Sequence, residues 1–198
     1  MIIEIEKSFF KRFFDFLIER EPTVSVREEA DVYIYDLADY LNRYRKRSSK
    51  RFLKHTLLPA VAIFRALCDT WLKEERILSL MAEYVDQYAA GRLCLYRAKG
   101  GVGKLTGSYR SAVYAEMKKR EEGWNKVWLY NTAKESACNV TTCLVYEVCK
   151  ELECPALTVL FCDYEEKLLS GMNGGKGFVR NHTIGKGDDF CDFVFEEK

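Results

Sequence analysis

Cysteine offers the most chemistry of any residue type in this chain, because a thiolate attacks electrophilic carbon and binds soft metal ions. Most of the eight cysteines fall in the C-terminal third, at Cys138, Cys143, Cys149, Cys154, Cys162 and Cys191. None forms a Cys-x-x-Cys pair, which argues against a zinc ribbon, a thioredoxin motif or a standard iron–sulfur run. Thiols that act together must therefore be brought together by tertiary folding.

Three of these thiols lie in different predicted elements. Cys143 stands where a strand passes into a helix, and the dipole of a helix N-terminus favours a thiolate. Cys162 lies in the middle of a helix, just off its apolar stripe, and Cys191 lies in the middle of a strand. A nucleophilic thiolate, a tetrahedral metal site with an open position and an inert core position all fit this pattern. Residue chemistry alone favours the inert core, since buried cysteine packs as a small apolar side chain.

Two basic stretches resemble ligand-binding motifs, but simpler explanations fit them better. Lys99–Lys104 is glycine-rich like a phosphate-binding loop, yet Leu105 stands in place of the magnesium-binding hydroxyl and Ala98 replaces the first glycine. A flexible basic turn, or a mobile loop that covers a substrate, accounts for this stretch. The basic run Arg43–Lys54 is most simply a solvated helix face.

The composition describes a globular chain that is long enough for one hydrophobic core. The 198 residues are 48% hydrophobic and carry a formal net charge of +1, so the overall charge does not attract nucleic acid or acidic membranes. The N-terminus lacks the apolar core of a signal peptide, and the longest apolar stretch, Leu57–Cys68, is interrupted by Pro59 and Arg65. We therefore expect a cytoplasmic protein whose cysteines are thiols.

Hydrophobic periodicity changes character halfway along the chain. The first half has apolar stripes at helical spacing, for example over residues 9–17, and a further helix is expected over about Ser108–Arg120. Short β-prone runs follow between residues 127 and 142, and two strands are expected at 178–183 and 190–195. These patterns predict an α+β fold with N-terminal helices packed on a small, mainly antiparallel sheet formed by the C-terminal half.

No linker or internal repeat divides the chain, so we predict a single domain over residues 1–198. Residues 1–122 form its mostly helical part. Residues 123–198 form a mixed, cysteine-rich part that carries the site. Period-two alternation in the last two strands gives Arg180 and Cys191 each a defined face.

The C-terminal third contains an ordered set of reactive and polar residues. The set comprises Cys143, Cys162-Asp163, Arg180-x-x-Thr183, Gly187 and Cys191-Asp192-Phe193. This set resembles the L-2-amino-thiazoline-4-carboxylic acid hydrolase family, and its ending is the most specific part. The segment is more distantly similar to vinyl-reductase-type and transport-particle-like domains, which are α+β modules that often bind small molecules or lipids.

The resemblance implies a small-molecule hydrolase that opens a cyclic C–N or C–S bond in a carboxylate-bearing substrate. The prototype reaction of the family converts 2-aminothiazoline-4-carboxylate to a carbamoyl-cysteine. A thiolate or a polarised water would attack the ring carbon while an aspartate orients water or moves a proton. The catalytic candidates at the matching positions are Cys143, Cys162, Asp163, Cys191 and Asp192.

Arg180 and Thr183 are the candidates for substrate binding. A guanidinium pairs with a carboxylate through two parallel hydrogen bonds, and Thr183 would supply a hydroxyl contact. A structural role, in which Arg180 pairs with Asp163 or Asp192, is the alternative. If Arg180 binds the substrate, Arg180→Ala should reduce turnover far more than stability.

No cofactor is predicted. Because His55 and His182 are the only histidines, a histidine-rich metal site is excluded, although Cys143, Cys162 and Cys191 would suit zinc if a metal is present. The alternative function is a non-catalytic small-molecule or lipid-binding or sensor module of the same fold, and a metal- or redox-sensing protein is the third. The expected partner is a small-molecule substrate, with no nucleic acid and no membrane, and a homo-oligomer is compatible with the sequence.

Overall fold

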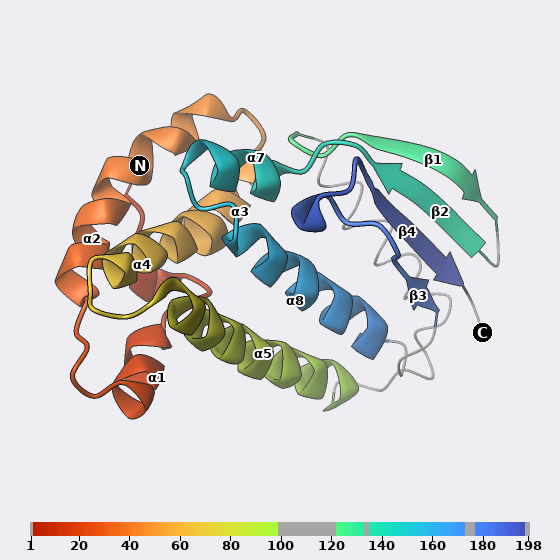
Figure 1. Ribbon diagram of the computed structural model, residues 1–198. Helices are drawn as coiled ribbons and strands as arrows, with labels where there is room; N and C mark the ends of the chain where they lie inside the picture. The colour runs from red at the N-terminus through yellow and green to blue at the C-terminus, as the bar shows by residue number, and fades with distance from the viewer. Residues whose placement is uncertain (1, 99–121, 133–134, 173–176, 197–198) are drawn as a thin grey trace. The chain divides into compact units, whose positions relative to one another are not determined.

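The computed structural model describes residues 2–98, 122–132, 135–172 and 177–196 (Figure 1). The chain forms two compact units, Met1–Tyr84 and Val85–Lys198, and the boundary falls inside the long helix α5 (Glu74–Ala98). The single domain over residues 1–198 stays a prediction. The glycine-rich stretch at 99–104 and the helix expected near 108–120 lie outside the described residues.

The first unit is helical, as the apolar stripes predict. Its elements are η1 (Ile5–Lys7), α1 (Phe13–Arg20), α2 (Arg27–Asp36), η2 (Leu37–Arg43), α3 (Arg47–Phe52), the π-helical turn η3 (Leu53–Leu57), α4 (Leu58–Cys68) and the start of α5. Nearly all of α4 is buried, which makes it the central helix of this unit. No helix in the described ranges is both long and apolar enough to cross a membrane.

Tyr84 joins an aromatic cluster in the core of this unit. Its ring stacks on Phe10 with centroids 5.5 Å apart, and it meets Phe13 and Phe16 edge-on at 5.3 and 5.6 Å. Its hydroxyl donates to the carbonyl of Phe9 over 3.0 Å, so the polar end of the ring is satisfied inside the cluster. The stripe predicted from Phe9 onward does pack the core, although α1 begins only at Phe13.

The second unit contains a four-stranded sheet in the order β1-β2-β4-β3. All three pairs of neighbouring strands are antiparallel. The strands are β1 (Lys126–Asn131), β2 (Glu135–Val140), β3 (Phe178–Val179) and β4 (Cys191–Glu196). Helices mostly in the N-terminal half and an antiparallel sheet in the C-terminal half confirm the predicted α+β class.

One face of the sheet carries aromatic side chains and faces the helix α8 (Leu157–Met172). The ring of Phe178 lies 5.8 and 5.3 Å from the rings of Phe193 and Phe195, since alternate residues of β4 share this face. Helix α8 packs against β3 and against the short 3-10 helix η5 (Ile184–Lys186) (Figure 1). A shorter helix, α7 (Leu144–Glu151), connects β2 to α8. This packing brings α8, η5 and β4 together, and the candidate site lies among them.

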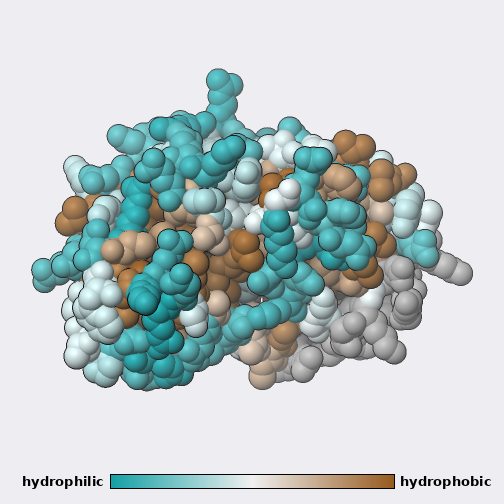
Figure 2. All heavy atoms as spheres, viewed as in Figure 1, coloured by the Kyte–Doolittle hydropathy of each residue, from teal (hydrophilic) through white to brown (hydrophobic). Residues whose placement is uncertain are grey.

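The outer strand β1 leaves apolar side chains exposed. Val127, Leu129 and Tyr130 are exposed to 55%, 58% and 42%, and Trp128 to 38%. Figure 2 shows hydrophobic residues gathered over this edge of the sheet. Only β2 pairs with β1 among the described strands, so the other edge of β1 has no strand beside it there.

Candidate functional site

Three cysteines from three elements influence one another in the second unit. Cys143 directly precedes α7, Cys162 lies in α8, and Cys191 begins β4. The charged form of Cys143 raises the pKa of both Cys162 and Cys191, and Cys191 raises the pKa of Cys162. Contacts with η5 link two of them, because the Ile184 amide donates to Cys191 Sγ and a carbon added at Gly185 would lie 2.9 Å from Cys162 Sγ. Tertiary folding has therefore brought Cys162 and Cys191 to neighbouring residues of one turn, and Cys143 is linked to them only through its electrostatic influence.

Burial keeps two of these thiols protonated. Cys162 and Cys191 are only 8% and 5% exposed. Burial raises the pKa of Cys162 to about 12 and that of Cys191 to about 11, and nearby Arg180 offsets part of both increases. The amide of Ile184 also donates to Cys191 Sγ over 3.2 Å. Cys143 is less buried than either of them.

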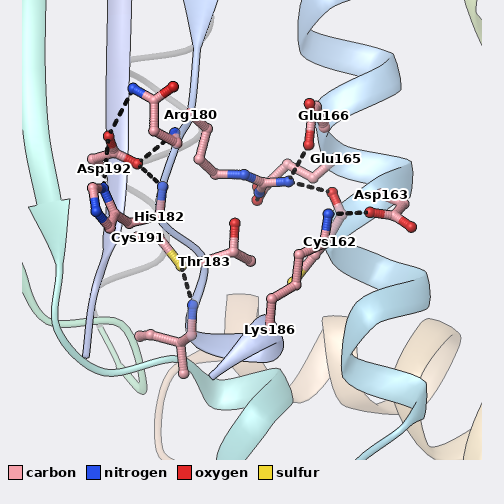
Figure 3. Close-up of polar contacts among 12 residues, drawn as sticks. Cys162, Asp163, Glu165, Glu166, Arg180, His182, Thr183, Lys186, Cys191 and Asp192 are labelled. Carbon is pink, nitrogen blue, oxygen red and sulfur yellow. Dashed lines mark hydrogen bonds and ion pairs between the residues drawn. The ribbon is translucent and has the colours of Figure 1, made fainter. Parts of the chain in front are cut away.

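Arg180 is buried against α8 and is already engaged (Figure 3). Its side chain is 1% exposed, and Nη2 donates to the carbonyl of Cys162 and to Glu166 Oε2, each over 2.9 Å. Nη1 lies 3.6 Å from Glu165 Oε2, and the guanidinium sits 5.7 Å from the centre of the Phe193 ring. Burial alone would lower the pKa of Arg180, but the two glutamates outweigh it and the pKa stays raised.

The partners of Arg180 differ from the aspartates considered in the structural alternative. Asp163 forms an ion pair with Lys186 instead, and Asp192 accepts a hydrogen bond from the amide of His182. Glu165 and Glu166 are three and four residues beyond Cys162, so they share its side of α8. The three- and four-residue spacing from Cys162 is the feature of the sequence that points to these two glutamates as neighbours of the site.

Asp192 ties down the chain that leads from β3 to η5. Its Oδ1 accepts hydrogen bonds from the amides of Asn181 and His182 over 2.8 and 2.5 Å. Burial would raise the pKa of Asp192, but these bonds and the His182 side chain hold it below its usual value. Adjacent residues of a strand point to opposite faces, so Asp192 projects away from the Cys191 side. The structure does not bring Asp192 to the three thiols.

The turn at η5 lies directly on α8. A methyl group added at Gly185 would come within 2.8 Å of Thr158 Cγ2 and 2.9 Å of Cys162 Sγ. Thr183 is buried beside this turn. Its amide donates to Asp188 Oδ2 over 2.6 Å, which fixes its backbone. The close approach of Gly185 covers the Cys162 thiol with backbone.

Replacing Gly185 by Ala should destabilise the protein by about 1–3 kcal/mol, because the added carbon overlaps side chains of a packed helix. The matched control is Gly91→Ala in α5, where nothing lies within 4 Å of the added carbon. That change should be neutral or slightly stabilising, since Ala favours a helix over Gly. Chemical denaturation of both variants provides the comparison. Equal unfolding midpoints would contradict the close packing of η5 on α8.

Metal binding and the remaining cysteines add little to this site. Within the described ranges, no three His, Cys, Asp or Glu side chains are grouped so that they could hold a metal ion. Cys138, Cys149 and Cys154 are buried, and burial raises the pKa of Cys138 to about 11. These thiols occupy core positions, as the packing interpretation of the cysteines predicts.

The fold and the site define an α+β protein with thiols gathered beside a buried arginine. The chain belongs to the L-2-amino-thiazoline-4-carboxylic acid hydrolase family, whose sequence profile matches residues 50–195. The match corrects the prediction that the resemblance covers only the C-terminal third. The additional matched residues carry mainly apolar stripes at helical spacing and lack the cysteine and aspartate pattern on which the resemblance rests.

The comparison with other proteins is otherwise sparse. No curated protein matches the chain. A solved structure of an unliganded Fe(II) H-NOX protein variant from K. algicida is similar at 13% identity over 96% of this chain and 94% of its own. Its TM-score of 0.33 does not establish a shared fold.

Proposed function

We propose that this protein is a small-molecule hydrolase that opens a ring C–N or C–S bond in a carboxylate-bearing substrate similar to 2-aminothiazoline-4-carboxylate. The observation that supports the proposal is that Cys162 and Cys191 both contact the η5 turn near Arg180, and that Cys143 influences the pKa of both, in a chain of this hydrolase family. A thiolate suits attack on an electrophilic ring carbon.

The net reaction adds one water across a ring bond. The water oxygen bonds to the amidine-like ring carbon, the ring bond breaks, and the leaving sulfur or nitrogen takes a proton from the water. In the covalent variant, a cysteine Sγ first bonds to that carbon as the ring opens, and water then displaces the cysteine. Both routes consume one water and need no oxidant or reductant.

Cys143 is the proposed nucleophile. It is half-buried and stands at the N-terminus of α7, where the helix dipole favours a thiolate. Cys162 and Cys191 are less suited to attack, because burial holds them as neutral thiols. They would instead shape the wall of the site. Asp163, half-exposed and next to Cys162, is the proposed proton carrier, and Thr183 would offer a hydroxyl contact.

Turnover of 2-aminothiazoline-4-carboxylate, followed by NMR detection of the ring-opened product, tests this proposal. Cys143→Ser should lower kcat on the order of 100-fold or more, because a hydroxyl is a much weaker nucleophile. Cys94→Ser, which replaces an exposed cysteine of α5, is the control and should leave kcat unchanged. Full turnover in Cys143→Ser would show that this cysteine is not the nucleophile, and no turnover in the unmodified protein would contradict the hydrolase.

A non-catalytic ligand-binding or sensor module is the second candidate. One observation favours it, namely that Cys162 and Cys191 are buried and protonated and so pack rather than react. Binding of the ring compound without turnover, unaltered in Cys143→Ser, would favour this candidate over the hydrolase.

A further inference from the structure

We infer that Lys186 binds the carboxylate of the substrate at the solvent-facing side of the thiol site, and that Asp163 occupies this position until the substrate arrives. The substrate class rests on the proposed function. The inference itself concerns binding, and it assigns the carboxylate to a residue other than Arg180.

Arg180 is poorly placed to receive an incoming carboxylate. Its side chain is 1% exposed, and its guanidinium already contacts Glu165, Glu166 and the Cys162 carbonyl. Its Nε is buried without a hydrogen-bond partner among the described residues, but a carboxylate that reached it would lose its own hydration and lie close to Glu165 and Glu166, which is costly. Arg180 is better described as the residue that fixes α8 against the end of β3.

Lys186 lies beside the same site but faces solvent. Its side chain is 50% exposed, and its Nζ lies 3.1 Å from Asp163 Oδ1. The preceding residue, Gly185, lies against Cys162 Sγ, so Lys186 stands at the edge of the thiol site. In Figure 3 the ammonium end of Lys186 points toward Asp163, beside Cys162.

The backbone that carries Lys186 is fixed in place. The Lys186 amide donates to the Thr183 carbonyl over 2.8 Å, and the Thr183 amide donates to Asp188 over 2.6 Å. Gly187 closes the turn at a φ of 102°, a left-handed conformation that glycine adopts without strain. The ammonium therefore starts from a rigid base, which reduces the entropy that binding must cost.

The existing partner of Lys186 can be replaced. Asp163 is itself 46% exposed, and an ion pair between two half-exposed side chains is weak because water and salt compete for both charges. A substrate carboxylate can take the place of Asp163 on the ammonium. The released aspartate then remains beside Cys162, where the proposed function needs a proton carrier.

The test compares the binding of 2-aminothiazoline-4-carboxylate with that of 2-aminothiazoline, which lacks the carboxylate, to the full-length protein. Calorimetry gives Kd, or initial rates give KM where turnover occurs. The unmodified protein should prefer the acid by about tenfold, the effect of one charge-assisted contact. Lys186→Met should lose this preference, and Lys186→Arg should keep most of it.

Asp163→Asn distinguishes a lysine that binds substrate from one that serves only in a structural ion pair. Removing the competing carboxylate should tighten binding of the acid by roughly threefold or more, with no such gain for 2-aminothiazoline. If the pair served only to hold η5 on α8, Lys186→Met and Asp163→Asn would weaken the binding of both compounds, and the inference would be wrong.

The remaining outcomes separate this inference from the proposed function. Equal binding of the two compounds by the unmodified protein overturns the inference, since no residue then recognises the carboxylate. An unchanged preference in Lys186→Met also overturns it and leaves Arg180 as the candidate for the carboxylate. Preferential binding that depends on Lys186, without any turnover, supports the inference and contradicts the hydrolase.

Discussion

Replacing Arg180 by Met should lower the free energy of unfolding by about 2–4 kcal/mol, since removing one partner of a buried ionic network leaves the others uncompensated. The change removes the two hydrogen bonds that Nη2 donates, to the Cys162 carbonyl and to Glu166 Oε2. Glu165 and Glu166 are partly exposed, at 27% and 45%, so water recovers some of the loss. The expected cost therefore lies below that of a fully buried pair.

Urea denaturation of Arg180→Met measures this effect, and Arg76→Met is its control. Arg76 pairs with Glu21 over 2.7 Å, but its side chain is 43% exposed, so its loss should cost less than about 1 kcal/mol. Equal stabilities of the two variants would contradict a structural role for Arg180. Burial also alters the sequence-based expectation for Arg180→Ala, because a stability loss should now accompany any loss of turnover.

Alkylation at pH 8 should separate the buried thiols of the site from the exposed cysteines by a large factor. An ordinary thiol is about a quarter ionised at this pH, whereas a thiol with a pKa of about 11, as for Cys191, is ionised to roughly one part in a thousand. For Cys162, with a pKa of about 12, the thiolate is another factor of about ten scarcer. Burial slows reaction further by excluding the reagent.

Mass spectrometry of iodoacetamide-treated protein measures these rates at each cysteine. Cys68 and Cys94 are exposed and provide the reference. Cys191 and Cys162 should react at least about 100-fold more slowly in the native protein, and as fast as the reference cysteines in denaturant. Rapid native labelling of Cys162 would contradict the burial of this thiol.

The same thiols make stability depend on pH in a defined direction. Their folded-state pKa values lie above the unfolded value, so the folded protein keeps protons that the unfolded chain gives up. Their contribution is therefore fully present below pH about 8.5, the unfolded pKa, and it is lost as the pH rises toward 11.

The last two strands show how much of the structure local sequence patterns predict. The sequence predicts strands at 178–183 and 190–195, and strands form there, but β3 ends at Val179. The reason is that the Asp192 carboxylate takes the amides of Asn181 and His182, which would otherwise join the ladder with β4. Residue types indicate that aspartate can compete in this way, but only the folded chain places it opposite those amides.

The sequence by itself determined the α+β class, the family, and the elements on which the three thiols stand. Hydrophobic periodicity and motif order are properties of neighbouring residues, so they can be read along the chain. The tertiary structure decided that Arg180 pairs with Glu165 and Glu166, and that Cys162 and Cys191 are protonated. Pairing and burial depend on how η5 and α8 pack, which brings together residues that lie far apart in the sequence.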